Sequence, residues 1–163
     1  MRLRSRWGTH IPVLIRLMQV ASGPVLELGS GYFSTPFLHW ACFDRCMRLV
    51  TYDNNPQYVS MLKWFNNDLH QINLIEDWDT IDLSESWGAA LVDHAPGPRR
   101  YKEVARLQHV PFVVLHDTSG RGWRENGYHK VNGLFRYRWT YDKVHPATTV
   151  VSNSVDLREV FGP

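Results

Sequence analysis

Acids and histidines stand at the ends of several short apolar runs in this chain, where they could bind a ligand or move a proton. The first run and the turn after it read VLELGSGYFST, residues 25–35, in which two glycines follow an acid. Carboxylates hold cations and hydroxyls, and imidazoles exchange protons near neutral pH. The acids and histidines at or near the ends of these runs are Glu27, Asp53, Asp93, His94, His116 and Asp117.

The turn at Gly29–Gly31 suits two kinds of cofactor, because glycines let the backbone come close to a ligand. A dinucleotide fingerprint, G-x-G-x-x-G, needs a third glycine where this chain has Ser34. Glu27, two residues before Gly29, places a negative charge near a pyrophosphate but would attract a cation. The turn therefore favours S-adenosylmethionine, whose sulfonium and ammonium groups are positive, over NAD.

Asp53 ends the second apolar run, RLVTYD, and is placed to accept hydrogen bonds from ribose hydroxyls. Dinucleotides and S-adenosylmethionine both require such an acid. Asp53 therefore predicts a nucleoside site and does not choose between the two cofactors.

Alternating strand and helix patterns must position these residues. Short apolar runs predict strands, and 3.6-residue spacing predicts helices between them, beginning with Ile11, Leu14, Ile15 and Met18. We expect Thr9 to cap that first helix. The strands are expected at residues 24–29, 48–53, 71–75, 87–93, 111–116, 135–142 and 147–152. This order predicts a three-layer, Rossmann-like α/β sandwich with a mostly parallel seven-stranded sheet and a C-terminal antiparallel hairpin.

Composition limits the class of protein. The chain has 163 residues, 44% of them hydrophobic, and a formal charge of +2. We expect a single domain, residues 1–163, without enough net charge to indicate nucleic acid as a partner. No stretch is long and apolar enough to cross a membrane, and Arg16 interrupts the apolar N-terminal run, which disfavours a signal peptide. Cys42 and Cys46 are expected to be buried free thiols in a cytoplasmic protein.

The sequence resembles the class I S-adenosylmethionine-dependent methyltransferases, and within them the small O-methyltransferases similar to catechol O-methyltransferase. The resemblance rests on VLELGSG, LVTYDNNP, WGAALVDHAPG and PFVVLHDTSG, in this order along most of the chain. It implies methyl transfer from S-adenosylmethionine to an oxygen or nitrogen nucleophile.

The resemblance also implies a role for each position. The cofactor-binding residues would be Glu27, Gly29, Ser30, Gly31, Ser34, Asp53, Asn54, Asp77, Trp78 and Asp93. Among these, Asp77 and Trp78 would contact adenine, and Trp78 could stack on the purine or serve as a packing residue.

Catalysis and metal binding would involve the later strand ends. The resemblance implies Mg²⁺ at Asp93 and Asp117, but Thr118 replaces the Asn that usually follows, and the family's basic Lys is missing. His94 or His116 would then act as the base, with Asp93 beside them. In the alternative without metal, Asp93 faces the cofactor and Asp117 caps a loop.

Basic and aromatic residues in the second half of the chain suit a small-molecule or carbohydrate-like acceptor, or else form a solvated face. They include Arg99, Arg100, Lys102, Arg121, Arg124, Lys130, Arg136 and Arg138. The short loops predict an open acceptor site, which a large acceptor or a second subunit of a homo-oligomer would close. Three alternative functions stay open: an inactive module that binds S-adenosylmethionine or its demethylated product, an NAD-dependent oxidoreductase, and an enzyme that cleaves S-adenosylmethionine.

Overall fold

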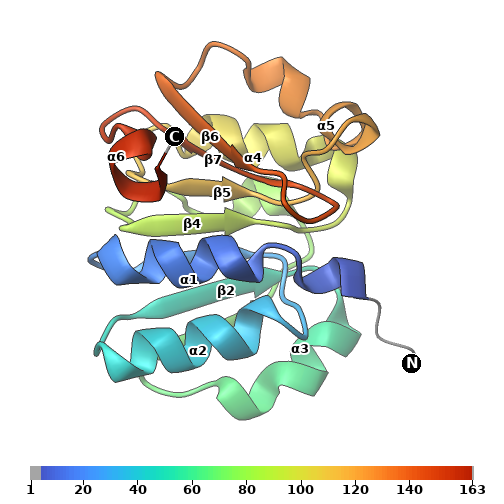
Figure 1. Cartoon of the computed structure of the whole chain (residues 1–163). Coiled ribbons are helices and arrows are strands. Elements are labelled where there is room, and N and C mark those ends of the chain that lie inside the picture. Colours follow the sequence, from blue (N-terminus) through green and yellow to red (C-terminus); the bar gives the residue numbers. More distant parts are fainter. Residues whose placement is uncertain (1–4, 163) are drawn as a thin grey trace.

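A seven-stranded mixed sheet forms the centre of the protein, with helices on both of its faces (Figure 1). A computed structural model describes residues 5–162. The strands are β1 (Val25–Leu28), β2 (Leu49–Asp53), β3 (His70–Leu74), β4 (Ala89–Val92), β5 (Val113–Leu115), β6 (Tyr137–Tyr141) and β7 (Thr148–Ser152). Their order across the sheet is β3-β2-β1-β4-β5-β7-β6. Only β7 runs antiparallel to its neighbours β5 and β6. The predicted fold class is confirmed.

The strand order determines where a ligand site can form. The chain passes from β1 outward to β2 and β3, and then returns to place β4 on the other side of β1. In open α/β sheets, ligands bind beyond the carboxyl ends of the strands where the order reverses in this way. The loops after β1 and β4 therefore border the expected crevice.

The helices lie in two layers. α1 (Ile11–Val20) and α2 (Ser34–Asp44) cover one face of the sheet together with α6 (Leu157–Phe161), and α4 (Arg100–Arg106) covers the opposite face (Figure 1). The other helices are α3 (Pro56–Leu62) and α5 (Arg121–Glu125). Short 3-10 turns are η1 (Ser5–Gly8), η2 (Lys63–Phe65), η3 (Trp78–Thr80), η4 (Gly97–Arg99) and η5 (Tyr128–Val131).

Side-chain alternation along the strands separates two hydrophobic clusters. On β1, Val25 packs in the cluster with α1 and α2, and Leu26 packs in the cluster with α4. Leu17 of α1 and Leu38 of α2 are fully buried in the first cluster. Burying a side chain of this size contributes roughly 1.5–3 kcal/mol. This packing holds β1, and with it the glycine turn, between two fixed layers.

Two local expectations are wrong. The residue before α1 is His10, which makes no capping hydrogen bond, and Thr9 instead contacts His116 with its hydroxyl group. Cys42 is buried as expected, but Cys46 is exposed after α2 because the chain turns there with a positive φ of 51°. Within residues 5–162, we find no helix with the length and apolar character needed to span a membrane.

Candidate functional site

The backbone N–H groups of the turn after β1 donate hydrogen bonds to acceptors of the protein itself. Gly29 has a φ of +95°, and a Cβ there would lie 2.5 Å from the backbone of His94, so only glycine fits. The N–H of Gly29 donates to the carbonyl of Tyr52 at 2.9 Å, and that of Ser30 donates to Asp53 Oδ2 at 2.6 Å. The N–H of Gly31 donates to Thr35 Oγ1 at 2.9 Å. All three amide groups are therefore engaged inside the turn.

Asp53 joins the turn to the start of α3. Its Oδ2 also accepts from Ser30 Oγ at 2.7 Å, and its Oδ1 accepts from the N–H of Asn55 at 2.7 Å. The side chain is 5% exposed and borders the cavity described below. Each carboxylate oxygen can accept more than one hydrogen bond, so Asp53 can still receive a ribose hydroxyl.

Glu27 lies beneath the turn and not in the cavity lining. Its carboxylate is fully buried and accepts hydrogen bonds from Thr35 Oγ1 at 2.9 and 3.0 Å and from Thr51 Oγ1 at 2.8 Å. Burial raises the pKa of Glu27 to about 7, although these hydroxyl groups and that of Ser34 oppose the rise. Glu27 supports the turn through Thr35, which in turn accepts from Gly31.

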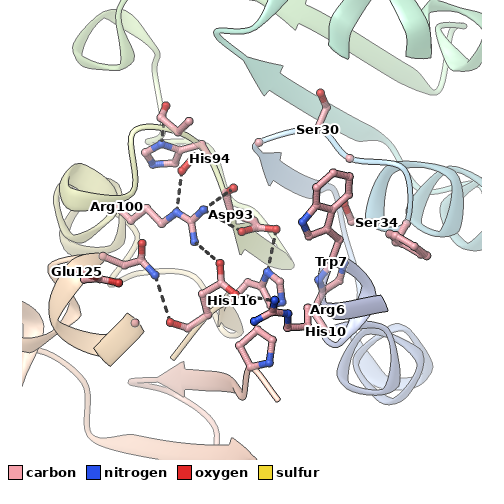
Figure 2. A pocket seen from close by; sticks show the side chains of 18 of the residues that line it. Arg6, Trp7, His10, Ser30, Ser34, Asp93, His94, Arg100, His116 and Glu125 are labelled. Atoms are coloured by element: carbon pink, nitrogen blue, oxygen red, sulfur yellow. Dashed lines mark hydrogen bonds and ion pairs between the residues drawn. The ribbon is translucent and has the colours of Figure 1, made fainter. Parts of the chain in front are cut away.

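A single cavity of about 810 Å³ extends from this turn across the ends of β4 and β5 (Figure 2). On one side it is lined by the turn, Asp53, Asn55 and Tyr58. On the other side it is lined by residues from the N-terminal segment and from the loops after β4 and β5. These include Arg6, Trp7, His10, Asp93, Arg100, His116, Asp117 and Ser119.

Asp93 and His116 form a hydrogen-bonded pair at the centre of the cavity. Asp93 Oδ2 lies 2.9 Å from His116 Nδ1, and Asp93 Oδ1 lies 2.9 Å from Arg100 Nη2. Burial alone would raise the pKa of Asp93, but the charges of His116 and Arg100 hold that pKa well below its usual range. Burial would lower the pKa of His116, but the Asp93 carboxylate outweighs it and the pKa is raised. The predicted partners Asp93 and His116 are therefore brought together.

The predicted Mg²⁺ site at Asp93 and Asp117 does not fit the structure. The guanidinium group of Arg100 contacts both side chains, since its Nη1 lies 3.7 Å from Asp117 Oδ2. The Arg100 guanidinium already neutralises both carboxylates, and the other Asp93 oxygen contacts the imidazole of His116. Mg²⁺ requires near-octahedral oxygen ligands, which this arrangement does not offer.

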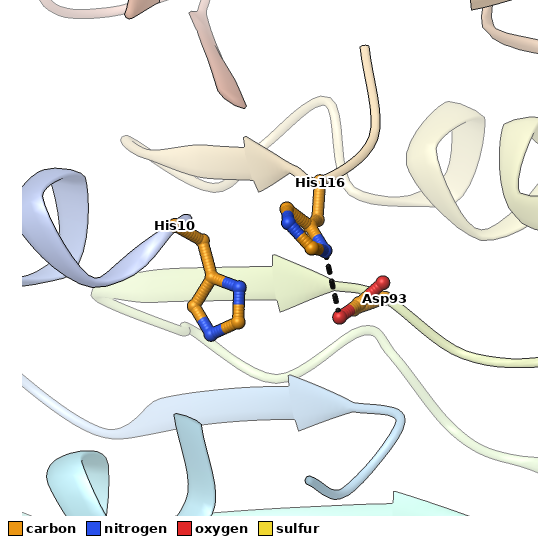
Figure 3. A group of neighbouring side chains, drawn as sticks. All are labelled: His10, Asp93 and His116. Carbon is orange, nitrogen blue, oxygen red and sulfur yellow. Dashed lines mark hydrogen bonds and ion pairs between the residues drawn. The ribbon is translucent and has the colours of Figure 1, made fainter. Parts of the chain in front are cut away.

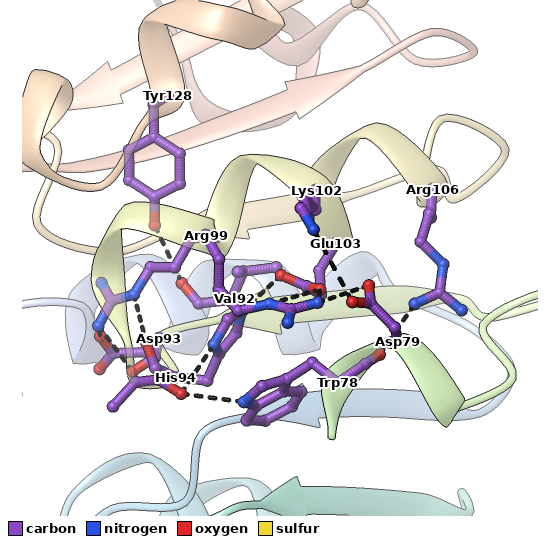
Figure 4. Close-up of polar contacts among 12 residues, drawn as sticks. Trp78, Asp79, Val92, Asp93, His94, Arg99, Lys102, Glu103, Arg106 and Tyr128 are labelled. Atoms are coloured by element: carbon purple, nitrogen blue, oxygen red, sulfur yellow. Dashed lines mark hydrogen bonds and ion pairs between the residues drawn. The ribbon is translucent and has the colours of Figure 1, made fainter.

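The rings of His94 and Trp78 pack against each other (Figure 4). Their rings stack at a centroid distance of 4.0 Å, and the indole N–H donates to the carbonyl of Ala95 at 2.9 Å. His94 Nε2 lies 3.0 Å from Glu103 Oε2, and both side chains are buried. Trp78 is only 2% exposed and absent from the cavity lining, so its role here is packing. The predicted purine stacking does not fit a ring that His94 already covers.

The other predicted cofactor-binding residues differ in whether they line the cavity. Ser30, Gly31 and Ser34 line the cavity. Asn54 does not, and the next residue, Asn55, takes that place and caps α3 with its side chain. The exposed Asp77 caps η3 and lies 3.7 Å from Arg99.

Sequence reasoning missed His10 and the inward position of Arg100. His10 is 1% exposed, and its ring meets that of His116 edge-on at 4.5 Å (Figure 3). Burial lowers the pKa of His10 to about 4, and the charge of His116 acts in the same direction. One ligand atom from each of His10, Asp93 and His116 lies within 4.8 Å of the others, a group that could hold a metal ion. The residues around His10 carry no local signal for this position, because its contact with His116 depends on how α1 packs in the fold.

Most of the predicted basic surface is paired within the protein. Arg99 contacts Asp79 and Glu103, both at 2.8 Å, and Arg121 contacts Glu125 at 2.6 Å. Three other predicted basic residues lie over aromatic rings: Arg136 over Tyr137, Arg138 over Trp123 and Lys130 over Tyr101. These contacts favour a structural role for the basic residues outside the cavity.

The fold is similar to that of several solved methyltransferases. An O-methyltransferase from Bacillus cereus in complex with S-adenosylhomocysteine matches with a TM-score of 0.63 at 14% identity, over 92% of this chain and 81% of that one. TomG from Streptomyces achromogenes, an O-methyltransferase of tomaymycin synthesis bound to S-adenosylmethionine, matches with a TM-score of 0.58 at 18% identity, over 92% and 80%. The S-adenosylhomocysteine-bound methyltransferase PaMTH1 from Podospora anserina matches with a TM-score of 0.66 at 12% identity, over 92% and 79%.

These similarities define the class of fold. The chain has the Rossmann-like fold of S-adenosylmethionine-dependent O-methyltransferases, including the antiparallel β7 between β5 and β6. No protein-family model matches the sequence, and no curated protein is significantly similar to it. At these identities the similarity establishes the fold, and the acceptor and the activity must be argued from the site.

Proposed function

We propose that the protein transfers a methyl group from S-adenosylmethionine to an oxygen or nitrogen nucleophile of a small-molecule or carbohydrate-like acceptor. One observation carries the proposal. A single cavity joins the glycine turn and Asp53, which suit a nucleoside cofactor, to a polar wall that includes Asp93 and His116. A methyl donor and an acceptor can therefore meet in one cavity, and placing the nucleophile in line with the sulfonium supplies much of the rate enhancement.

The hydrogen bonds of the turn argue against a dinucleotide. A pyrophosphate is normally held by free backbone N–H groups of the glycine turn and the following helix. Here the amides of Gly29, Ser30 and Gly31 donate to Tyr52, Asp53 and Thr35. An anion would have to compete with these bonds and would also meet the Asp53 carboxylate. A cationic nucleoside avoids both penalties.

The two predicted bases differ in their freedom to act. Both histidines line the cavity. The ring of His94 is held between Trp78 and Glu103, on the side of α4. In His116, Asp93 engages Nδ1 and Thr9 engages Nε2 at 3.0 Å. His116 is thus the better candidate of the two, with Asp93 orienting its ring.

Calorimetry with S-adenosylmethionine, S-adenosylhomocysteine and NAD tests the cofactor. We expect binding of the first two and not of NAD. Asp53→Asn should weaken S-adenosylmethionine binding at least about tenfold, because the ribose hydroxyls lose a charged acceptor. Asp68→Asn, at an exposed position, is the matched control and should bind normally. Tight binding of NAD, or an unchanged Kd in Asp53→Asn, would contradict the proposed cofactor site.

A product assay separates transfer from binding. Release of S-adenosylhomocysteine should depend on the acceptor when a panel of hydroxyl and amine compounds is supplied. Cofactor binding without product formation on any acceptor would indicate the inactive binding module. Breakdown of S-adenosylmethionine in the absence of an acceptor would indicate a cleaving enzyme.

A further inference from the structure

His10 is a buried imidazole that has no hydrogen-bond partner within residues 5–162. Its side chain is 1% exposed, and neither Nδ1 nor Nε2 is hydrogen-bonded. A buried polar group without a partner is unfavourable, and a charged imidazole without one is more so. The ring is therefore neutral, and at least one nitrogen has a free lone pair. His10 also lines the cavity, so a ligand can reach it.

Two further metal-binding groups lie next to His10. It stands at the start of α1, whereas Asp93 follows β4 and His116 follows β5, so three separate elements converge here (Figure 3). Their ligand atoms lie within 4.8 Å of one another. Ligands at about 2 Å from one ion lie about 3.3 Å apart, so the three side chains must close in slightly. His10 can make this movement because no hydrogen bond holds its ring.

Thr9 determines which nitrogen of His116 is available. The Thr9 hydroxyl lies 3.0 Å from His116 Nε2 and donates to the carbonyl of Arg6 at 3.4 Å. We therefore assign a proton to Nε2, which donates to Thr9. His116 Nδ1 also donates, to Asp93 Oδ2 at 2.9 Å, because a carboxylate oxygen only accepts. A metal ion between these two atoms would displace the Nδ1 proton, and Nε2 would keep its own.

We propose that His10, Asp93 and His116 bind a divalent transition-metal ion of the zinc type. Two imidazoles and one carboxylate form a set that binds Zn²⁺, Co²⁺ or Fe²⁺ and not the oxygen-preferring Mg²⁺. Arg100 holds the other Asp93 oxygen, and Thr9 holds the other His116 nitrogen, as outer partners commonly do around metal ligands. Because the group lines the cavity, positions on the ion stay open for water or an acceptor hydroxyl. With the ion bound, His116 would be a ligand and not the base.

Cobalt titration of the untagged, chelator-treated protein tests the proposal directly. Co²⁺ should bind at one equivalent and produce visible d–d absorption, and Zn²⁺ should displace it. His10→Ala should weaken Co²⁺ binding at least about tenfold, with an unchanged circular dichroism spectrum. His129→Ala removes an exposed histidine and is the matched control, which should bind as the wild type does.

Asp117→Asn distinguishes this site from the carboxylate pair. It should leave Co²⁺ binding intact, because Asp117 is not in the ligand set. The proposal is overturned if the wild type binds neither Co²⁺ nor Zn²⁺, if His10→Ala binds normally, or if Mg²⁺ binds and Asp117→Asn abolishes it. The titration needs no S-adenosylmethionine, so its outcome is independent of whether methyl transfer occurs.

Discussion

Replacing Glu27 by glutamine should change how stability depends on pH. Burial raises the pKa of Glu27 to about 7 from an ordinary value of 4.5. Between these pH values the folded protein binds more protons at Glu27 than the unfolded chain does. The contribution of this group to the free energy of unfolding is therefore largest below pH 4.5 and is lost as pH rises to about 7. The full change corresponds to about 3 kcal/mol.

Urea unfolding of wild type and Glu27→Gln at pH values from 5 to 8 measures this effect. Glutamine does not ionise, so the variant should gain stability relative to wild type by roughly 2–3 kcal/mol across the range. Comparing the two proteins cancels all other titrations, and the offset from altered hydrogen bonds to Thr35 and Thr51 is independent of pH. Glu159→Gln, at an exposed acid, is the matched control.

Two results would refute the reasoning about Glu27. A stability difference that is constant from pH 5 to 8 would show that the carboxyl group has the same pKa in the folded and unfolded states. A wild type that gains stability over the variant as pH rises would show that the hydroxyl groups outweigh burial. In either case the buried acid would be ionised under the turn at neutral pH.

Three further substitutions test the packing around the site. Trp78→Leu should lower the free energy of unfolding by about 3 kcal/mol and leave the Kd for S-adenosylmethionine unchanged; a weaker Kd in the folded variant would restore the purine-stacking role. Arg100→Met removes one of the two positive partners of the half-buried Asp93 carboxylate and should destabilise by roughly 1–3 kcal/mol in chemical denaturation. No measurable loss would mean that His116 and solvent satisfy Asp93 without Arg100. Leu17→Ala, in the core under α1, should cost roughly 2–5 kcal/mol, and a negligible loss would contradict its close packing.

The fold could be predicted from the sequence because its signals are local. The run VLELGSG shows a strand that ends in a turn where Gly29 is required, and strand β6 alternates covered and exposed residues as its period of two predicts. Apolar strands without alternation likewise predicted that β4 is buried on both faces. Each of these patterns depends on neighbours within a few residues, so the chain itself carries the information.

The site could be predicted only in part, because its partners are distant along the chain. Asp93 and His116 stand at strand ends, where the topology rule points. His10 belongs to the first helix, and nothing in its own neighbourhood indicates that α1 starts beside β5. Arg100 was expected either to bind an acceptor or to lie on a solvated face, whereas α4 turns Arg100 and Glu103 inward to contact Asp93 and His94. Helical spacing of apolar residues cannot reveal an inward face made of charges.

Glu27, within β1, and Asp93, just after β4, have opposite electrostatic roles. Glu27 on β1 is surrounded by hydroxyl groups without a cation, so its pKa rises toward neutrality. Asp93 follows β4, and its N–H donates to the carbonyl of Leu28, yet Arg100 and His116 hold its pKa far below the usual range. Environments that shift the pKa values of two carboxyl groups in opposite directions suit the two groups to different functions. The permanent negative charge therefore lies at the wall proposed for the acceptor, and the group that titrates near neutral pH lies beneath the turn proposed for the cofactor.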